Sequence, residues 1–199
     1  MRITVKVGLL FAALWILIKM FFFWTGALGQ NVVPMVLLNM LFVLLAISVA
    51  LYLHKLKQTE YTNALGDIKN SMTAGVPYAM IVSIFIYAYY AKIDPEFNEH
   101  QKSEWEMRVK KELDAPGGLE KAQENNPDFE VLERDEIITK MKSGYESFYN
   151  PTATMTLSML ALLLLATLNS IFVTVIMRRV VFRNMKYPNP ADEEPPVIN

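Results

Sequence analysis

Cysteine is absent from the 199 residues, and its absence excludes disulfides, thiolate catalysis and cysteine-based metal sites. The chain also lacks a phosphate-binding loop, the dinucleotide motif G-x-G-x-x-G, the hydrolase motif G-x-S-x-G and the zinc motif H-E-x-x-H. An apolar segment separates its only two histidines, His54 and His100. These absences predict that the chain is not an enzyme and holds no catalytic residue, cofactor or metal. A membrane enzyme with a carboxylate site at the membrane surface is the least favoured alternative.

Charged residues are nearly missing from four long segments, whose only charges are Lys6 and Lys19. A helix needs about 20 apolar residues, at ~1.5 Å per residue, to cross roughly 30 Å of hydrocarbon. Four such segments exclude a soluble globular domain, a disordered chain and a secreted disulfide scaffold. The sequence therefore predicts an all-α membrane protein with four transmembrane helices in contact with the lipid bilayer. The segments are 5–24, 33–53, 74–91 and 153–177.

Basic residues are distributed unevenly among the segments that connect these spans. With a cytoplasmic N-terminus, nine lysines and arginines lie on the inner side. The short loop 25–32 has none, and the long segment 94–146 carries 15 acidic against 8 basic residues. Because basic residues near span ends mark the cytoplasmic side, we expect both termini to be cytoplasmic and the two histidines to lie on opposite sides. The inner basic residues are Arg2, Lys6, Lys55, Lys57, Lys69, Arg178, Arg179, Arg183 and Lys186.

Aromatic residues at the span ends are typical of membrane interfaces, and basic residues there suit anionic lipid headgroups. Lys19 lies five residues before Trp24, so its ammonium can extend outward to the interface. A role for Lys19 in an ion path is the alternative. The predicted interfacial anchors are Trp24, Tyr87, Tyr89, Tyr90, Tyr149, Arg178 and Arg179.

The first span has a competing interpretation. Two basic residues before an apolar run, followed by Ala27, Leu28 and Gly29, are also typical of a signal peptide with a small-x-small cleavage site. The apolar run is long for a signal core and Lys19 interrupts it near its end, which favours a retained span. Cleavage would remove this span and leave the remaining topology unchanged.

Small residues recur four apart in every predicted span and therefore share a helix face. Helices in lipid associate by close backbone approach and hydrogen bonds, because lipid tails are as apolar as leucine. A stripe in every span predicts a compact bundle. The amides of Asn39 and Asn169 fit either interhelical hydrogen bonds or a polar path. The predicted packing residues are Gly8, Ala12, Asn39, Ala46, Ala50, Gly75, Ala79, Ser83, Ala166, Asn169, Ser170 and Thr174.

The segment 92–152 is too long for a connector and is patterned as an amphipathic helical hairpin on the outer side. Asp94 and Pro95 predict a helix start with Asp94 as its cap, and Asn150 is predicted to cap the fourth span. Apolar residues recur at helical spacing along two stretches, which a polar stretch with turn signals separates. They are Phe97, Trp105, Val109 and Leu113 in the first stretch, and Ile137, Ile138, Met141, Tyr145 and Phe148 in the second.

One row on the first outer helix has the residue types of a metal site. Glu96, His100 and Glu104 lie four apart, and such a row can bind a divalent metal weakly. Pairing of Glu with His on a solvated face is the commoner outcome, so no metal is expected. The soluble part also has no basic aromatic surface, which argues against nucleic-acid binding.

Four parts are predicted along the chain. Residues 1–91 form three spans with short loops, including a basic cytoplasmic connection at 54–73. The outer hairpin takes residues 92–152, the fourth span with its basic end 153–183, and a tail rich in proline and acid 184–199. The composition of this tail predicts disorder.

The stretch Y-Y-A-K-I-D-P-E-F at 89–97 resembles the junction Y-Y-x-x-I-D-P-E-F of an uncharacterised family of four-span proteins, the domain of unknown function forty-one ninety-nine, found mainly in Bacteroidota. Order and spacing agree over about residues 5–183. The longer outer loop and the tail depart from the family pattern, so the resemblance says little about the hairpin. It implies the inner membrane of a Gram-negative cell and supplies no activity or ligand. The junction residues are Asp94, Pro95, Glu96 and Phe97.

The leading hypothesis is a non-enzymatic inner-membrane protein whose periplasmic hairpin contacts a partner protein or a second copy of the chain. The alternative is a small transporter or channel, with Asn39, Asn169, Ser83 and Ser170 along a polar path. No Asp, Glu, Arg or His lies inside the four segments. Ion-coupled transporters normally need such buried ionisable groups, so this absence favours the leading hypothesis.

Overall fold

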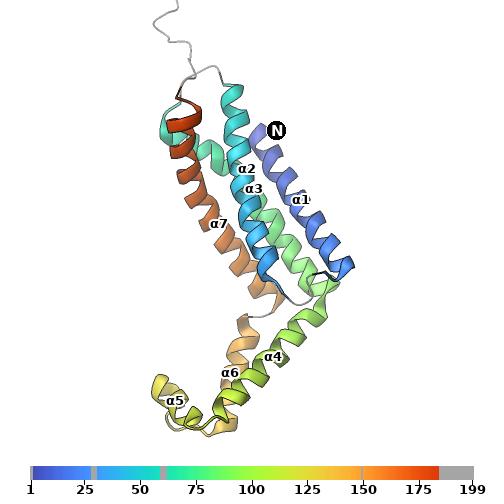
Figure 1. Cartoon of the computed structure of the whole chain (residues 1–199), viewed down its shortest axis with the longest axis vertical. Helices are drawn as coiled ribbons and strands as arrows, with labels where there is room; N and C mark the ends of the chain where they lie inside the picture. Colours follow the sequence, from blue (N-terminus) through green and yellow to red (C-terminus); the bar gives the residue numbers. More distant parts are fainter. Residues whose placement is uncertain (1, 28–30, 59–61, 149, 184–199) are drawn as a thin grey trace, which may run out of the picture. The chain divides into compact units, whose positions relative to one another are not determined.

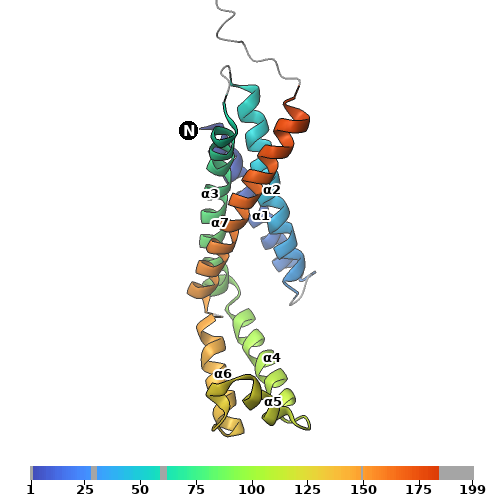
Figure 2. The same cartoon turned by 90° about the vertical axis from the view of Figure 1, so that its left-hand side faces the viewer.

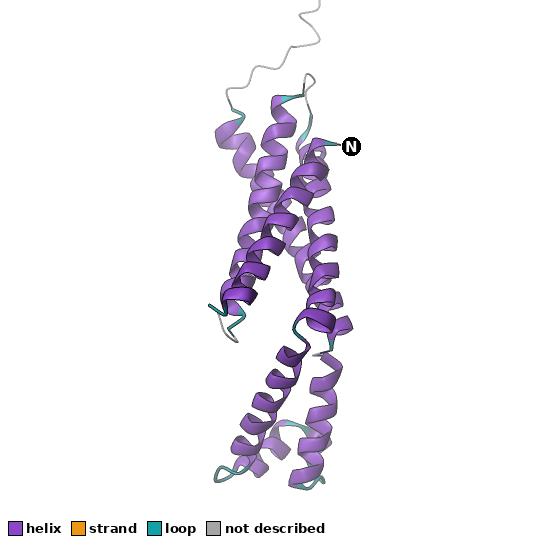
Figure 3. Cartoon of the chain, turned by 90° about the vertical axis from the view of Figure 1, so that its right-hand side faces the viewer, coloured by secondary structure: helices purple, strands orange, loops and turns teal. Residues whose placement is uncertain are grey.

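The computed structural model describes residues 2–27, 31–58, 62–148 and 150–183. Within these ranges the chain consists of helices joined by short loops and contains no strand (Figure 3). The predicted disordered tail at 184–199 lies outside the described residues. The chain folds as two compact units, which are described separately. The bundle unit takes the described residues of Met1–Val82 and Met159–Asn199, and the insert unit takes those of Ser83–Ser158.

In the described residues, four helices are long and apolar enough to cross a membrane, which agrees with the predicted number. They are α1 (Ile3–Thr25), α2 (Val33–Leu56), α3 (Ala64–Ala88) with its continuation η1 (Tyr89–Ile93), and α7 (Pro151–Ile176) with its continuation η3 (Met177–Val181). Both continuations are single π-helical turns.

The connection between the second and third spans is shorter than the predicted 54–73. Helix α2 runs to Leu56, and α3 begins at Ala64, ten residues before the predicted third span. A helix continues as long as its backbone groups are paired, whether or not its side chains are apolar. The Asn63 side chain caps the start of α3 by accepting a hydrogen bond from the Gly66 amide at 2.8 Å. With this cap, α3 can begin in polar residues, before the apolar segment 74–91 that was used to predict the third span.

Close backbone contacts hold the bundle unit together. A side chain at Gly8 of α1 would overlap the backbone carbonyl of Ala74 in α3. A Cβ at Gly75, on the next position of α3, would lie 2.8 Å from the Cβ of Ala166 in α7. Both glycines are buried, so each allows two helix axes to approach more closely than any larger residue would. Figure 2 shows the four helices of this unit side by side.

Hydrogen bonds between helices accompany these contacts. The Tyr78 hydroxyl of α3 donates to the side-chain oxygen of Asn39 in α2 at 2.5 Å, and both residues are buried. Thr73 of α3 donates to Thr4 of α1 at 2.5 Å. In lipid no water competes for these groups, and interhelical bonds of this kind are worth about 0.6–2 kcal/mol each.

The insert unit has an apolar core of its own. Helix α4 (Pro95–Leu113) packs against α6 (Arg134–Phe148), and α5 (Gly118–Asn125) and the short η2 (Pro127–Phe129) complete the unit (Figure 1). The predicted polar stretch between the two outer helices is therefore partly helical. The core consists of Val109, Leu113, Ile137 and Ile138, with Trp105, Leu119, Ala122, Phe129, Leu132 and Met141 packed against it.

Ion pairs join α4 to α6 on the surface of the insert unit. The Arg134 guanidinium donates to both carboxylate oxygens of Asp114, at 2.7 and 3.0 Å. Lys142 of α6 lies 3.3 Å from Glu106 of α4. The hydrogen bond from Arg134 holds the pKa of Asp114 below its usual value. Hydrogen bonds from Lys110, within α4, and from Lys142 lower the pKa of Glu106.

Replacing Gly8 by alanine should destabilise the bundle unit. The new methyl group would meet backbone rather than a flexible side chain, so α1 and α3 must separate, at a cost of about 1–3 kcal/mol. The matched control is Gly144→Ala in α6, where nothing lies within 4 Å of the new Cβ. That change should stabilise its helix by about 0.5–1 kcal/mol. Thermal unfolding followed by circular dichroism measures both, and equal shifts would contradict the packing argument.

Acid should loosen the insert unit by a small amount, because the ion pair of Arg134 with Asp114 is exposed to solvent. Because the pKa of Asp114 is lowered in the folded state, its pairing contributes stability above the ordinary aspartate pKa and loses it as pH falls through the folded value. The protection factors of backbone amides in α4 and α6 against hydrogen exchange should therefore fall as the pH drops below about 4, the ordinary range of an aspartate pKa. Arg134→Gln should weaken this acid response. The control Arg108→Gln breaks a pair within α4 and should keep it; an unchanged response in Arg134→Gln would refute the linkage.

Candidate functional site

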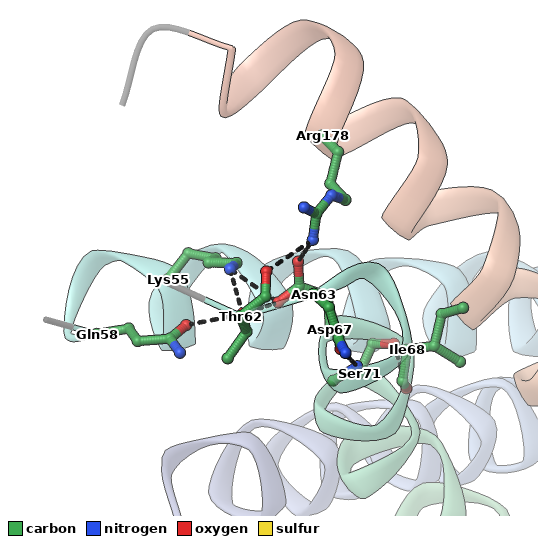
Figure 4. A network of polar contacts seen from close by, with 9 residues as sticks. Lys55, Gln58, Thr62, Asn63, Asp67, Ile68, Ser71 and Arg178 are labelled. Atoms are coloured by element: carbon green, nitrogen blue, oxygen red, sulfur yellow. Dashed lines mark hydrogen bonds and ion pairs between the residues drawn. The ribbon is translucent and has the colours of Figure 1, made fainter. Parts of the chain in front are cut away.

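Three charged side chains meet at the end of the bundle unit where α2 finishes and α3 begins (Figure 4). Oδ1 of Asp67 lies 2.8 Å from the Lys55 ammonium, and Oδ2 lies 2.6 Å from Nη1 of Arg178. The side chains of Asp67 and Lys55 are 0% and 3% exposed, and that of Arg178 is 26% exposed. We call Lys55, Asp67 and Arg178 the ion network.

Thr62 connects all three charges of the ion network. Its hydroxyl accepts a hydrogen bond from Lys55 and donates one to Oδ1 of Asp67, both at 2.6 Å. Its backbone carbonyl accepts from Nη1 of Arg178 at 3.0 Å. The Phe182 ring lies 5.9 Å from the Lys55 ammonium, within cation–π range. Buried charges are tolerated when they are paired and hydrogen-bonded in this way.

Helix ends position the ion network. Asp67 lies in the first turn of α3 and Lys55 in the last turn of α2, and the helix dipoles favour an acid and a base at these respective ends. Arg178 lies in the π-helical turn η3. A π-helical turn is rare and occurs frequently at functional sites. Three separate elements thus bring their charges to one point.

The ion network lies at the ends of helices that are able to cross a membrane, just outside the apolar segments of the sequence. Lys55, Asp67 and Arg178 all fall inside these helices. Each of these helices continues beyond its apolar segment into polar residues. Arg178, predicted to anchor at lipid headgroups, pairs with Asp67.

The predicted packing residues lie almost entirely in the interior. Asn169 is half-buried and the others are buried. Asn39, Ser170 and Thr174 all lie in the interior of the bundle unit. Asn39 accepts a hydrogen bond there from Tyr78. The buried set is Gly8, Ala12, Asn39, Ala46, Ala50, Gly75, Ala79, Ser83, Ala166, Ser170 and Thr174.

The predicted interfacial anchors fall into two groups. Trp24, Tyr87 and Arg179 are exposed, as an anchor requires. Tyr89 is buried and donates a hydrogen bond to Asp94 at 3.2 Å. The Tyr90 ring is half-buried and packs on Phe97, with ring centres 5.2 Å apart. Arg178 belongs to the ion network, and Tyr149 lies outside the described residues.

The junction residues form a corner within the insert unit. Asp94 accepts a hydrogen bond from the Phe97 amide at 3.2 Å, which confirms it as the cap of α4, and Pro95 is the first residue of that helix. Glu96 lies in the first turn. Asn150 accepts from the Ala153 amide at 2.8 Å and caps α7 as predicted. The motif thus fixes where the π-helical turn η1 ends and α4 begins.

The insert unit contains a pocket of about 470 Å³ above its apolar core. Val109, Leu113, Phe129 and Met141 supply apolar walls, and Glu112 and Lys121 are among its polar lining residues. In the described part of the chain no group of three His, Asp or Glu residues is arranged to hold a metal ion. His100 instead lies 3.6 Å from Glu104, the pairing expected on a solvated helix face.

Some of the residues that were missed do have local signals in the sequence. Asn63 is one of the residue types preferred as the N-cap of a helix. A helix that begins after Asn63 would have included Asp67. Tyr78 stands inside an apolar span, where a hydroxyl needs a partner. The pairing of Asp67 with Arg178, 111 residues apart, has no local signal.

The model of the family DUF4199, whose members are described as proteins of unknown function, matches residues 6–179. The chain therefore belongs to the DUF4199 family, and the resemblance of its junction is confirmed. No curated protein and no solved structure matches the chain.

Replacing Lys55 by methionine should destabilise the bundle unit by about 2 kcal/mol, because hydrogen bonds from a charged donor to Asp67 and Thr62 are lost. The matched control is Lys57→Met, two residues along, where the side chain is exposed. Its effect should remain within about 0.5 kcal/mol. Unfolding in lipid nanodiscs measures the difference. Similar losses for both lysines would show that the buried pair contributes nothing specific.

Proposed function

We propose that this member of the DUF4199 family is a non-enzymatic, multi-pass protein of the inner membrane of a Gram-negative bacterium. In this proposal its insert unit is the outer hairpin, which lies in the periplasm and contacts a partner protein or a second copy of the chain. The observation that carries the proposal is a separately packed helical unit with an open apolar pocket, inserted between membrane-capable helices.

Charge supports the orientation. One end of the bundle unit carries the start of α1, the junction of α2 with α3, and η3 (Figure 1). Eight described basic residues belong to these segments, against one described acid, Asp67. Such an excess marks the cytoplasmic side. If each apolar helix crosses the membrane, three crossings precede the insert unit, which then emerges on the opposite side.

Surface chemistry supports a contact role. The insert unit is coated with charged side chains, and its cross-helix ion pairs are exposed and contribute little to stability. Its pocket is mostly apolar with a few polar groups, the lining typical of binding sites. Elsewhere on the insert unit, Val131 and Met107 are 88% and 61% exposed. A contact that covers apolar groups of this kind would gain free energy from their burial.

The natural absence of cysteine allows a direct test. A single cysteine at the pocket, Lys121→Cys, is treated in spheroplasts with a membrane-impermeant maleimide that carries a photo-crosslinker. We expect labelling from outside and, after illumination, an adduct of higher mass that contains a partner or a second copy. Lys57→Cys, at the end of α2, should be labelled only after lysis. Ser103→Cys is exposed on α4 and does not line the pocket; it should be labelled and give little adduct.

The outcomes separate the two parts of this proposal. Labelling of position 57 but not position 121 in intact spheroplasts would refute the orientation. Labelling at 121 without any adduct would refute the protein contact and leave the orientation standing.

A second candidate function is transport of a small solute. It is favoured by the buried ion network and by the buried hydroxyls of Ser170 and Thr174 in the same unit, since polar groups inside membrane bundles often mark solute paths. Flux measured in reconstituted vesicles distinguishes transport from a contact role.

A further inference from the structure

Two facing rows of residues form the contact between α3 and α7 in the bundle unit. Asp67, Ser71 and Gly75 lie four apart on α3, and Ala166, Ser170, Thr174 and Arg178 lie four apart on α7 and η3, so each row shares a helix face. The contact of Gly75 with Ala166 and the pairing of Asp67 with Arg178 show that the rows face each other in antiparallel order. We call these seven residues the seam.

Two hydroxyls of the seam lack a protein partner. Ser170 and Thr174 are 0% and 1% exposed, and in the part of the chain that the structure describes neither hydroxyl makes a hydrogen bond. Their neighbour Thr167 behaves differently, since it donates to the Leu163 carbonyl one turn back at 2.8 Å. That local acceptor is the usual partner of a hydroxyl inside a helix. Ser170 and Thr174 do not use it.

Buried hydroxyls without a partner are costly, and ordered water is what usually satisfies them. A buried water needs two to four polar partners. Ser170 and Thr174 lie one turn apart on the same face and supply two. On α3, Ser71 lies midway between Gly75 and Asp67 and therefore faces the stretch of α7 that carries Ser170 and Thr174. The Ser71 hydroxyl donates to the Ile68 carbonyl at 2.8 Å, and its oxygen can still accept a hydrogen bond.

We propose that the seam binds water, held by the hydroxyls of Ser170 and Thr174 and donating to the hydroxyl of Ser71. The row ends at the ion network, where Asp67 and Arg178 are paired. Water bound at the seam hydrates the contact between α3 and α7 in the interior of the bundle unit, while the outer surface of the unit stays apolar. The ligand is water itself, and the site is independent of the contact role proposed for the insert unit.

Water-edited solid-state NMR tests the site on the full-length, isotope-labelled chain in lipid bilayers. Magnetisation from water should reach Ser170 and Thr174 several-fold faster than Ala46 and Ala50, which are equally buried in the same unit. Ser48 controls for exchange of a hydroxyl proton, because its hydroxyl is bonded to the Leu44 carbonyl at 2.8 Å. Transfer to Ser170 and Thr174 at the rate of Ala46 would show a dry seam and overturn the proposal.

The double variant Ser170→Ala/Thr174→Val removes both hydroxyls with little change in shape. Transfer from water to Ser71 should fall in this variant to the rate of Ala46. An unchanged rate at Ser71 in the folded double variant would also overturn the proposal, since the two hydroxyls would then hold no water. The wild-type measurement decides the question if the variant does not fold.

Discussion

Asp67 is the residue on which one end of the bundle unit depends. Its carboxylate, fully buried, accepts from Lys55 of α2, from Thr62 before α3 and from Arg178 of η3. In lipid the helices gain nothing from hiding apolar faces from one another, so contacts of this kind carry more of the specificity. Removing the carboxylate would leave two cations side by side, at a cost of about 3–5 kcal/mol when a buried pair is broken.

The rest of the bundle unit can form such short contacts because its helices approach closely. Gly8 and Gly75 bring the α3 backbone next to α1 and α7, and the hydrogen bond between Tyr78 and Asn39 joins α3 to α2. Helix α3 is thus the common neighbour of the other three. The polar contacts and the small residues act together, because helices held further apart could not form the interhelical hydrogen bonds of 2.5–2.8 Å.

What the sequence could predict followed from local spacing. Residues four apart on a helix share a face whatever surrounds them. The spacing of Ala46 with Ala50, and of Gly75 with Ala79, was therefore enough to predict that these residues face a neighbouring helix. Caps such as Asp94 are equally local. The ion network was missed because apolarity was used to place helix ends, and because the partners Asp67 and Arg178 are separated by most of the chain. A single sequence carries no record of which distant charges meet.

The two units follow opposite rules, and this contrast bears on function. The bundle unit hides its polar groups and exposes leucine, as a lipid-facing surface requires. The insert unit hides Val109 and Ile137 and exposes ion pairs, as a surface in water requires. Polar groups inside the bundle unit must form hydrogen bonds within the unit or bind water or another small polar ligand. Apolar groups left open on the insert unit, as in its pocket, can be covered only from outside. This contrast supports the proposed protein contact at the insert unit and the proposed water site at the seam.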